Sequence, residues 1–563
     1  MINILDNVRE DIINSLNKAL SELKSEGFIS LLDDIVIPLE TPKDPQMGEF
    51  ATTIALQLSK QVKCAPKVFA DKIVEKISIK DSKYIDAIEV AGPGFINFKL
   101  NSKWFAETLK AVRDNGEKYG DTNYGKDGKV LVEFVSANPT GPLNVVSARA
   151  AAVGDTLVRI LKATGYDAAS EFYINDAGNQ VDILGDSVYA RYMQIDNTDF
   201  PMLENGYMGE YVKDMALLIK NENEDKVACM SDEEKRVFFK ETSLKMIKEW
   251  QKKSLSQYGV EFDKWFSEKE LRDSGDVEKL INSMKDIGVV YEADGALWFR
   301  TTDFGDDKDR VMVKNDGSYT YMVPDLAYHQ NKVSRGYSKL IDILGPDHHG
   351  YQGRMIAGLM AFDNPCDTLE VILLQVVTLM QDGEPVKMSK RAGEFISMDE
   401  LLEDVPKDAA RYFFIMRNTS SHLDFDINLA KASTPDNPVW YIQYAHARAC
   451  SILRQADAAN ISRDEWQEAD FSLLSEPSEN ALIKKMAYLP DMLIEASIQR
   501  SPSMVTKYAY ELAQEFHSFY TECRVVGIDS KELTLARLAL IDCARIVVAK
   551  VLNIMGISSP DRM

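Results

Sequence analysis

The feature that most constrains the fold of this chain is a strand, a glycine-containing turn and a helix in direct succession. Lys129–Ser136 is a run rich in β-branched and aromatic residues, Asn138–Pro142 is a turn, and Ala148–Thr164 has the pattern of a helix. A second strand-like run, Ser170–Ile174, precedes a further helical pattern. Strand, turn and helix in this order are typical of a parallel, doubly wound sheet. The sequence therefore predicts an α/β domain.

The alternation of strands and helices stops after this unit and resumes later. Residues 195–285 are polar and helical in pattern, which predicts a helical insertion. A strand at Leu340–Leu344, a helix at Gln352–Ala361 and a very apolar strand at Leu369–Leu379 then continue the alternation. We expect all of these segments to belong to one sheet domain that spans residues 116–434.

Two further domains are expected to flank the sheet domain. Residues 1–115 begin with apolar residues at helical spacing and continue with a strand-like stretch, Ala87–Leu100, which predicts a small α+β domain. Residues 435–563 have a helical pattern throughout, which predicts an all-α domain. A chain of 563 residues is long enough to form several cores.

Charge composition alone does not identify the partner of this protein. The net charge is −23, and a strongly acidic protein is a poor match for the phosphates of a nucleic acid. From Pro435 onward, however, the chain has 13 Lys and Arg residues and 17 Asp and Glu residues, so the expected all-α domain is close to neutral. Composition neither requires nor excludes an RNA partner.

Cysteine spacing and hydropathy limit the class of protein. The six cysteines are scattered and include no C-x-x-C pair, whereas a zinc site needs clustered thiolates or imidazoles, so no protein-bound metal is expected. Residues Met1–Asp11 carry several charges and lack the basic and apolar regions of a secretory signal. No uncharged apolar run approaches the roughly 20 residues that a membrane span needs. These observations predict a cytoplasmic protein without a membrane contact.

Two short motifs lie where a parallel sheet domain could bind a nucleotide. Pro139–Arg149 follows the first strand and opens its helix, and helix N-termini bind phosphate through backbone N–H groups. In Val386–Gly393, Lys387 and Lys390 bracket Ser389, and such a loop can close over a polyphosphate. Each motif alone has an ordinary explanation, as a common turn or as a solvated basic patch. Their order on one parallel sheet favours nucleotide binding.

The two motifs together resemble the signature motifs of class I aminoacyl-tRNA synthetases. Lys387–Lys390 reads Lys-Met-Ser-Lys and matches the second motif, KMSKS, while Pro139–Arg149 stands in the place of the first motif, HIGH. The surrounding sequence is more selective. The segments that resemble arginyl-tRNA synthetases are Val132–Pro142, Glu171–Gly178, Thr320–His329, Gly345–Tyr351, Tyr441–Arg448 and Pro560–Met563. The similarity covers essentially the whole chain, in order.

The resemblance implies a fold and a reaction. The sheet domain would be a Rossmann-like catalytic domain with a helical insertion, the N-terminal domain would contact the elbow of the tRNA, and the all-α domain would bind the anticodon. The implied enzyme is an arginine–tRNA ligase that activates L-arginine with ATP and Mg²⁺ and transfers it to tRNA(Arg), with AMP and diphosphate as products. We expect it to act as a monomer and without zinc.

The resemblance also assigns residues to the ATP site. Catalysis would involve Asn144 and Ser147 in the first motif and Lys387 and Lys390 in the second. The residues that would contact ATP are Pro139, Gly141, Asn144, Ser147, Gly345, Asp347, His349, Met388, Ser389 and Lys390. The two lysines would stabilise the departing pyrophosphate.

The first motif departs from the family pattern at three positions. Asn144 and Ser147 stand where the family has histidines, and Val146 stands where it has glycine. Asn and Ser side chains are still neutral hydrogen-bond donors, whereas a branched residue would crowd the adenine. Two alternatives therefore stay open, a remodelled active site and a catalytically silent paralogue that only binds tRNA. The intact Lys387 and Lys390 favour an active enzyme.

Recognition of arginine requires fixed acceptors, because a guanidinium has five donors in a planar fork and no acceptor. By resemblance, Glu133 and Asn138 would hold the α-amino and carboxylate end of the substrate. Tyr321 and Asp325 would face the guanidinium, and Gln352 is a further candidate. These residues argue against a class I ligase for another amino acid. Their simpler interpretations are an edge-of-sheet charge for Glu133, a helix N-terminal acid for Asp325 and a core residue for Tyr321.

Candidate tRNA contacts lie near the start of the all-α domain. Proteins that bind RNA stack unpaired bases on aromatic rings and on the planar guanidinium of Arg. Tyr441, Tyr444 and Arg448 supply such groups at helical spacing. Because neighbours on one helix also face its core, some of these aromatic residues are expected to pack inside the domain.

Overall fold

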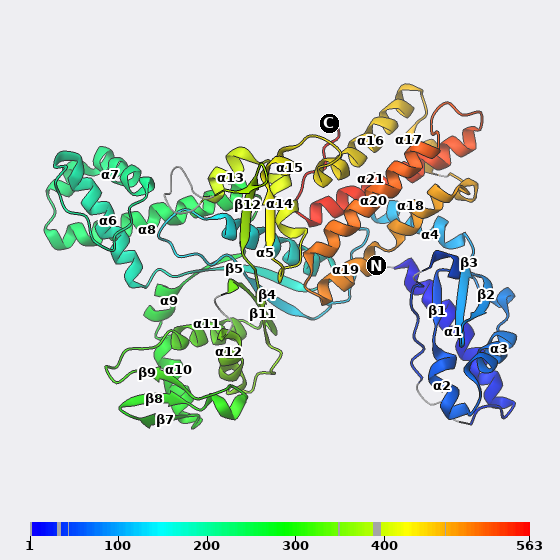
Figure 1. Cartoon of the computed structure of the whole chain (residues 1–563), viewed down its shortest axis with the longest axis horizontal. Helices are drawn as coiled ribbons and strands as arrows, with labels where there is room; N and C mark the ends of the chain where they lie inside the picture. The colour runs from blue at the N-terminus through cyan, green and yellow to red at the C-terminus, as the bar shows by residue number, and fades with distance from the viewer. Residues whose placement is uncertain (1–2, 31–34, 43, 347–349, 387–395, 468) are drawn as a thin grey trace.

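The computed structural model describes residues 3–30, 35–42, 44–346, 350–386, 396–467 and 469–563 (Figure 1). A parallel sheet with its helices lies near the middle of the molecule, and a helical unit projects from it on one side (Figure 1). The C-terminal helices lie on the other side, next to a separate N-terminal unit (Figure 1).

Five parallel strands form the central sheet, in the order β11-β10-β4-β5-β6. The strands are β4 (Lys129–Glu133), β5 (Asp167–Ile174), β6 (Lys264–Ser267), β10 (Lys339–Leu344) and β11 (Leu369–Leu373). Numbered along the chain and read from β6, the order is 3-2-1-4-5, which is the doubly wound arrangement. The predicted fold class is confirmed, and the strand order reverses between β4 and β10.

Alternate residues of the central strand β4 enter two different cores. The helices that cover the sheet include α5 (Val145–Ala163), α11 (Met322–Ser334) and α12 (Tyr351–Met360). Val130 and Val132 belong to the core that contains α5, whereas Leu131 belongs to the core that contains α11 and α12. This division follows from the two-residue period of a strand. Helix α5 approaches the sheet so closely that a Cβ at Gly154 would lie 2.1 Å from the ring of Phe134.

The helical insertion differs in extent from the sequence prediction. Helices α6 (Asn179–Asp196), α7 (Glu210–Ala228) and α8 (Asp232–Gln257) pack around a core of their own. The range 195–285 also contains strand β6, which pairs with β5 at the edge of the central sheet. A strand of four residues is too short to be recognised from its periodicity. The chain continues through α9 (Glu268–Asp273), α10 (Asp276–Asp286) and the antiparallel strands β7 (Val290–Ala293), β8 (Ala296–Phe299) and β9 (Arg310–Val313).

The apolar run Leu369–Leu379, expected to be one strand, is divided between two sheets. Its first part is β11 of the central sheet, and its second part enters β12 (Val377–Gln381). Strand β12 pairs in parallel with β14 (Leu423–Asp426) and in antiparallel with β13 (Glu384–Pro385). Helices α13 (Met398–Asp404), α14 (Lys407–Ile415) and α15 (Ile427–Lys431) complete this part of the chain.

The N-terminal unit is α+β and the C-terminal unit is helical, as the sequence predicts. The N-terminal elements are α1 (Ile4–Ser25), β1 (Phe50–Thr52), α2 (Ile54–Val62), α3 (Pro66–Lys76), β2 (Ile85–Ala91) and β3 (Phe95–Leu100), and the next helix, α4 (Lys103–Asn115), packs mainly against the C-terminal helices. The C-terminal helices are α16 (Pro438–Ala458), α17 (Arg463–Gln467), α18 (Pro477–Ala487), α19 (Leu489–Ile498), α20 (Pro502–Glu522) and α21 (Lys531–Ile554).

Polar contacts join the two terminal units. Asn3 Nδ2 donates to Asp491 Oδ1 at 2.7 Å, and Arg9 forms an ion pair with the same carboxylate. Lys484 Nζ lies 2.5 Å from Glu49 Oε1. In the described ranges, no helix is both long enough and apolar enough to cross a membrane.

Candidate active site

The carboxyl ends of β4 and β10 meet where the strand order reverses, which is where doubly wound sheets bind ligands. Glu133 ends β4 and lies opposite Asp342 of β10. Glu133 is 6% exposed and Asp342 is 1% exposed. Because β4 is the central strand, the interpretation of Glu133 as an edge-of-sheet charge does not hold. Buried carboxylates of this kind need partners.

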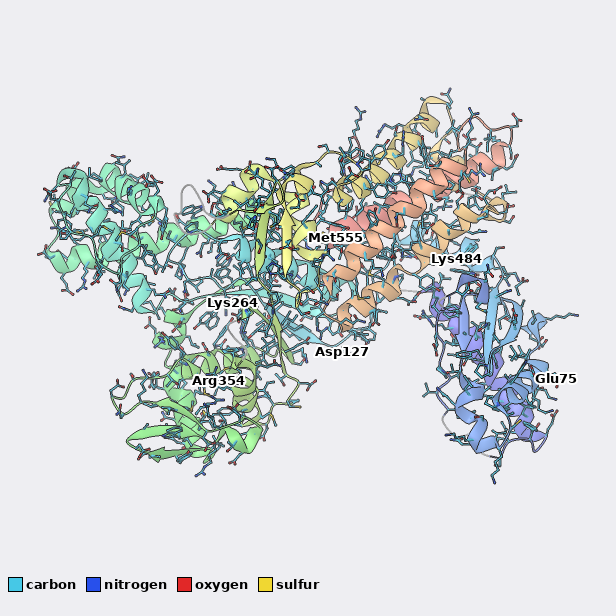
Figure 2. The ribbon with its side chains drawn as sticks, viewed as in Figure 1. Glu75, Asp127, Lys264, Arg354, Lys484 and Met555 are labelled. Atoms are coloured by element: carbon cyan, nitrogen blue, oxygen red, sulfur yellow. The ribbon has the colours of Figure 1, made fainter. Side chains whose placement is uncertain are left out.

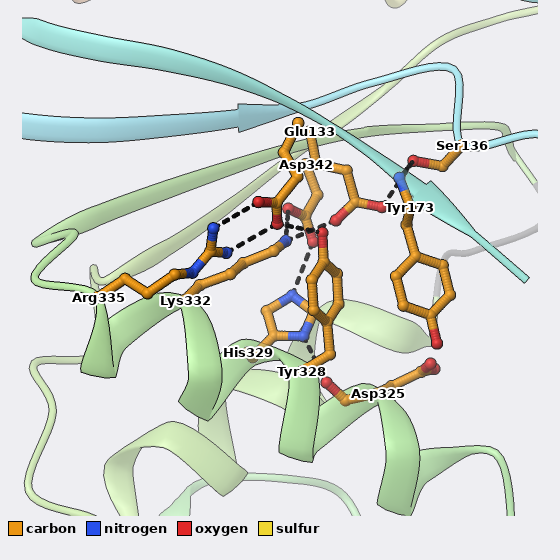
Figure 3. A network of polar contacts seen from close by, with 10 residues as sticks. Glu133, Ser136, Tyr173, Asp325, Tyr328, His329, Lys332, Arg335 and Asp342 are labelled. Carbon is orange, nitrogen blue, oxygen red and sulfur yellow. Dashed lines mark hydrogen bonds and ion pairs between the residues drawn. The ribbon is translucent and has the colours of Figure 1, made fainter. Parts of the chain in front are cut away.

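The cationic partner of both carboxylates is Lys332, whose side chain is completely buried (Figure 3). Lys332 Nζ lies 2.5 Å from Glu133 Oε2 and 2.9 Å from Asp342 Oδ1. His329 Nε2 donates to Asp342 Oδ2 at 2.8 Å. Burial alone would lower the pKa of Lys332, but the two carboxylates outweigh burial and raise it. Burial alone would raise the pKa of Asp342, but Lys332 and His329 hold it well below its usual range.

The backbone that follows β4 is strained. Val135 has φ 70° and Ser136 has φ 40°, in the left-handed region that a β-branched residue rarely adopts. This turn lets Ser136 Oγ donate to Glu133 Oε1 at 2.8 Å and accept from the backbone N–H of Tyr173 at 3.1 Å. Strain of roughly 1–3 kcal/mol per residue persists where the surroundings enforce it, commonly at ligand sites.

A second buried ion pair lies beside this network. Glu171 of β5 is completely buried and accepts from both terminal nitrogens of Arg335, at 2.5 and 2.8 Å. The hydroxyl of Tyr328 donates to Glu171 Oε1 at 2.7 Å. The pair is completed by Arg335, which lies on the side of the network away from Asp325 and Tyr173 (Figure 3). Its charges balance without a ligand.

Asp325 is an acid of the network that lacks a cationic partner. It lies in the first turn of α11, and its backbone carbonyl accepts from His329 Nδ1 at 2.7 Å. Its carboxylate makes no hydrogen bond or salt bridge to any residue that the structure describes. Burial raises the pKa of Asp325 to about 7, His329 offsets part of this effect, and Glu133 and Glu268 add to it. The surroundings therefore disfavour an ionised Asp325 until a cation binds.

Tyr173 presents a second unpaired polar group. Its hydroxyl is buried and makes no hydrogen bond of ordinary geometry within the described ranges. The hydroxyl points toward the Asp325 carboxylate (Figure 3). Burial, together with the nearby acids Glu268 and Asp325, raises the pKa of Tyr173. An unpaired buried hydroxyl is costly, so it marks a place where a ligand donor or acceptor fits.

Sequence reasoning missed Tyr173 and Glu268. Glu268 opens α9 at the carboxyl end of β6, is 6% exposed, and accepts from Arg272 Nε at 2.8 Å. Recognition of β6 as a sheet strand would have placed Glu268 at the ligand-binding edge. Tyr173 lies inside the segment Glu171–Gly178 that carries the resemblance, but nothing in the sequence indicates that its hydroxyl lacks a partner.

The other residues predicted for the arginine pocket lie outside this network. Tyr321 precedes α11 and is 88% exposed, so it is not a core residue. Asn138 is exposed, and its Nδ2 donates to Gln180 Oε1 at 2.9 Å. Gln352, in the first turn of α12, is exposed as well. The structure thus brings Glu133 and Asp325 into one network and leaves the other three at its outside.

The first motif forms the start of helix α5. Asn144 is its N-cap, and Asn144 Oδ1 accepts from the Ser147 backbone N–H at 2.9 Å and from Ser147 Oγ at 3.1 Å. The two positions at which the family has histidines therefore contact each other. Val146, between them, is 39% exposed. A helix N-terminus at the carboxyl edge of a parallel sheet is suited to bind phosphate.

The loop before α5 is held by the helical insertion. Gln251 Nε2 of α8 donates to the backbone carbonyls of Asn138 and Gly141, at 3.1 and 2.9 Å. Pro139 in this loop is buried. On the other side of the strand reversal, Gly345 follows β10, and a Cβ added there would meet no atom of the described residues within 4 Å. Gly345 therefore borders open space.

Most of the second motif and two further predicted ATP contacts lie outside the described residues. This applies to Asp347, His349, Lys387, Met388, Ser389 and Lys390, which were predicted to contact ATP or pyrophosphate. The described residues that follow the motif contact the first motif directly. Ser397 forms an antiparallel bridge with Asn144, and the Met398 N–H donates to the Leu143 carbonyl at 2.7 Å.

Family models match three consecutive parts of the chain. The arginyl tRNA synthetase N-terminal domain matches residues 8–100, the catalytic domain of class I (R) tRNA synthetases matches residues 108–429, and the DALR anticodon binding domain matches residues 442–563. The chain belongs to the arginyl-tRNA synthetase family. The resemblance drawn from the sequence is thereby confirmed.

Full-length relatives and solved structures agree with this assignment. The arginine–tRNA ligase of Symbiobacterium thermophilum is 44% identical over 560 residues, and that of Geobacillus kaustophilus is 43% identical over 562 residues; each match covers 100% of both chains. The solved structure of a putative arginyl-tRNA synthetase from Campylobacter jejuni has a TM-score of 0.75 and 32% identity over 82% of this chain and 100% of that chain. The Thermus thermophilus arginyl-tRNA synthetase shares the fold, with a TM-score of 0.74 and 20% identity over 99% and 100% of the two chains.

In this synthetase the three residues predicted to contact tRNA are partly exposed on α16. The Arg448 guanidinium lies over the rings of Tyr444 and Tyr520, at 5.2 and 4.5 Å from their centroids. The rings of Tyr441 and His517 lie 4.5 Å apart. These contacts form an aromatic and cationic surface at the start of the anticodon binding domain.

A cluster of three possible metal ligands lies in the same domain. His446, Cys450 and Asp561 have ligand atoms within 4.8 Å of one another, although the scattered cysteines predicted no metal site. His446 Nδ1 is 3.0 Å from the backbone carbonyl of Pro560, to which it must donate, so this nitrogen carries a proton. Burial raises the pKa of Cys450 to about 11. These features favour a hydrogen-bonded contact that anchors the C-terminal segment. They are less consistent with a metal site, which would need a free His446 nitrogen and a Cys450 thiolate.

Figure 2 shows that side chains project densely from the helical insertion and from the C-terminal helices. Lys484, which forms the ion pair with Glu49, lies where the C-terminal helices approach the N-terminal unit (Figure 2).

Proposed function

We propose that this synthetase uses ATP to activate L-arginine and then transfers it to tRNA(Arg). The observation that carries the proposal is the unpaired carboxylate of Asp325 beside the unpaired hydroxyl of Tyr173. A cation that enters this place stabilises the ionised form of Asp325. A guanidinium has donors only and is planar, so it can reach two acceptors at once, whereas a lysine ammonium is a point charge.

The α-amino end of arginine is assigned to Glu133. Lys332 and Ser136 occupy one site on each Glu133 oxygen, and a carboxylate offers about four acceptor sites, so two remain for an ammonium. The exposed Asn138, Tyr321 and Gln352 are assigned to contacts made around the bound substrate. Such contacts form when a flexible side chain closes over a ligand.

In the activation step, a carboxylate oxygen of arginine attacks the α-phosphorus of ATP. The bond from the α-phosphorus to the bridging oxygen breaks, so that arginyl-adenylate forms and pyrophosphate leaves with Mg²⁺. The α5 N-terminus, with Asn144 and Ser147, is assigned to the phosphates, and Lys387 and Lys390 are assigned to the departing pyrophosphate. The nucleotide would be framed by Pro139, Gly141, Gly345, Asp347, His349, Met388 and Ser389.

In the transfer step, a hydroxyl of the terminal ribose of tRNA attacks the carbonyl carbon of the adenylate, and AMP leaves. Tyr441, Tyr444 and Arg448 are assigned to tRNA binding, because aromatic rings and a guanidinium plane can stack on unpaired bases. We place the enzyme in the cytoplasm as a monomer, with ATP and Mg²⁺ as substrate and without zinc.

A charging assay tests this function. Purified full-length protein is incubated with tRNA, ATP, Mg²⁺ and radiolabelled arginine or lysine, and a third reaction contains no amino acid. We expect label in tRNA with arginine only, together with release of AMP. Tight tRNA binding without any charging would identify a silent paralogue, and charging with a different amino acid would identify another ligase.

A further inference from the structure

The buried side chain of Lys332 connects the two ends of the proposed arginine site. Asp325, His329 and Lys332 lie at positions i, i+4 and i+7 of α11 and therefore share one face of the helix. Lys332 donates a hydrogen bond to Glu133 at the end of β4, and His329 donates a hydrogen bond to Asp342 of β10 (Figure 3). Asp325 is assigned to the guanidinium, and Lys332 holds Glu133, which is assigned to the α-ammonium. Asp325 and Lys332 are separated by about two turns of helix, roughly 10.5 Å along its axis, and the spacing of the two acids depends on this separation.

Protein groups surround the ammonium of Lys332. Two bonds go to Glu133 and Asp342, and the ammonium lies 4.3 Å from the centroid of the Tyr328 ring. Its side chain is fully buried, so the Lys332 ammonium does not reach the surface where a substrate binds. Its effect on a ligand can therefore act only through the residues that it holds.

Glu133 is the residue whose orientation Lys332 controls. A glutamate side chain has three rotatable bonds, so the Glu133 carboxylate can turn unless its oxygens are held by donors. The Ser136 hydroxyl contacts one of its oxygens and the Lys332 ammonium contacts the other. Without the ammonium, Glu133 Oε2 loses its donor, and only the Ser136 hydroxyl still holds the carboxylate, which can then turn.

We propose that Lys332 is a positioning residue that fixes the Glu133 carboxylate relative to Asp325 and so sets the length of amino acid that the site accepts. This inference rests on the proposed function, because it takes arginine as the ligand that joins the two acids. Arginine of the correct length contacts both acids at once, whereas an analogue with one methylene more or fewer loses one contact. A pocket of defined length discriminates such analogues by about 10–200-fold.

The test compares variants of the full-length enzyme in the charging assay with arginine, homoarginine and the analogue one methylene shorter. For Lys332→Met we expect the KM for arginine to rise about tenfold or more and the preference for arginine over its two analogues to fall about tenfold. The change in KM should exceed the change in kcat, and the KM for ATP should stay within twofold. A residue that only stabilised the fold would lower the amount of active enzyme and leave these ratios unchanged.

Arg335→Met is the matched control, since Arg335 is the C-cap of the same helix and its substitution removes the cation from a different buried carboxylate, Glu171. It should lower the melting temperature to a similar degree and leave the KM and the length preference within twofold. If Lys332→Met does not fold, Lys332→Met/Asp342→Asn removes one positive and one negative charge together and leaves the site balanced. We expect this double variant to fold, as checked by circular dichroism, and to show the same changes in KM and preference.

A folded double variant with wild-type KM and wild-type length preference would overturn the positioning role of Lys332. If Arg335→Met raised the KM for arginine and weakened the length preference as much as Lys332→Met, the positioning role would be overturned as well. Loss of any buried cation near the site would then have the same effect. Wild-type enzyme that fails to charge tRNA with arginine would instead contradict the proposed function, so the two failures are distinguishable.

Discussion

Ser397 forms a backbone bridge with Asn144, the N-cap of helix α5. These residues are far apart in the sequence, and the bridge joins the segment after the lysine-containing motif to the start of helix α5. The capping box of α13, in which Ser397 is the N-cap and Glu400 the reciprocal acceptor, fixes Ser397 in place. The described segment that follows the second motif therefore lies against the first motif at one end of the sheet.

Asp325→Ala is predicted to abolish arginine activation and to leave the fold intact. Loss of the acceptor for a guanidinium should lower kcat/KM for arginine by about 10⁴-fold, since the donors of the substrate would stay unpaired in a buried site. Because no cation pairs with Asp325 in the described structure, the melting temperature should not fall. Charging kinetics and thermal unfolding test both statements, and a near-normal kcat/KM would remove Asp325 from the pocket.

The pKa of Asp325 predicts a specific dependence of stability on pH. Its folded pKa is raised from 3.8 to about 7, so the unfolded chain releases this proton at lower pH than the folded protein. The contribution of Asp325 to the free energy of unfolding should therefore decrease as pH rises from about 4 to about 7 and stay constant above. Denaturant titrations of the wild type and Asp325→Asn at several pH values measure it. The difference between the two proteins should grow over this window, and a constant difference would contradict the prediction.

Arginine binding should follow the same ionisation. A guanidinium pairs with the ionised carboxylate, so the KM for arginine should fall as pH rises from 6 to about 7 and then level off. The KM for ATP, measured in the same reactions, is the control and should not follow this curve. An arginine KM that is flat between pH 6 and 7.5 would show that Asp325 is ionised in the free enzyme.

Tyr173→Phe is predicted to weaken arginine binding without a loss of stability. The substitution removes only a hydroxyl, and that hydroxyl, although near Glu268, makes no hydrogen bond of ordinary geometry in the described structure, so the melting temperature should stay the same or rise. A hydrogen bond to a charged group contributes roughly 1.5–3 kcal/mol, so the KM for arginine should rise about tenfold or more. Tyr328→Phe, which removes a paired hydroxyl beside Glu171, is the contrasting variant and should lower stability instead. An unchanged KM in Tyr173→Phe would show that its hydroxyl does not meet the substrate.

Asn144→Ala separates the capping role of this residue from its role toward ATP. Loss of the N-cap should lower the free energy of unfolding by about 1 kcal/mol, and loss of the donor should lower kcat by about 10²-fold. Ser231→Ala removes the N-cap of α8 in the insertion and should cost similar stability with activity within twofold. Equal losses of activity in the two variants would mean that the cap alone explains the effect.

Arg448→Ala is predicted to affect tRNA and not the small substrates. Its guanidinium covers Tyr444 and Tyr520, and stacking of a base on such a surface contributes roughly 1–3 kcal/mol. The KM for tRNA should rise about tenfold, with the KM values for arginine and ATP within twofold. Lys507→Ala, an exposed lysine of the same domain, controls for the loss of a positive charge. A tRNA KM that changes equally in both variants would assign the effect to net charge.

Local patterns were sufficient for the central unit of the fold. The β-branched run of β4, the Gly and Pro turn and the helix that follows predict a parallel sheet, because each part has its own short-range signal. The placement of Glu133 and Asn144 at the strand end and the helix start follows directly. The strand β6 was missed because four residues carry no usable period, and its short length also concealed Glu268 at the ligand-binding edge.

The sequence by itself determined the family, the sheet and the two motifs, since these depend on neighbouring residues and on order along the chain. Only the tertiary structure decided which charges are compensated. Lys332 reads as one more polar residue of a helix, yet it is buried against Glu133, 199 positions away. Which acid is left without a partner depends on such long-range pairs, and in a buried site that balance, more than the identity of any single residue, decides where a cation binds.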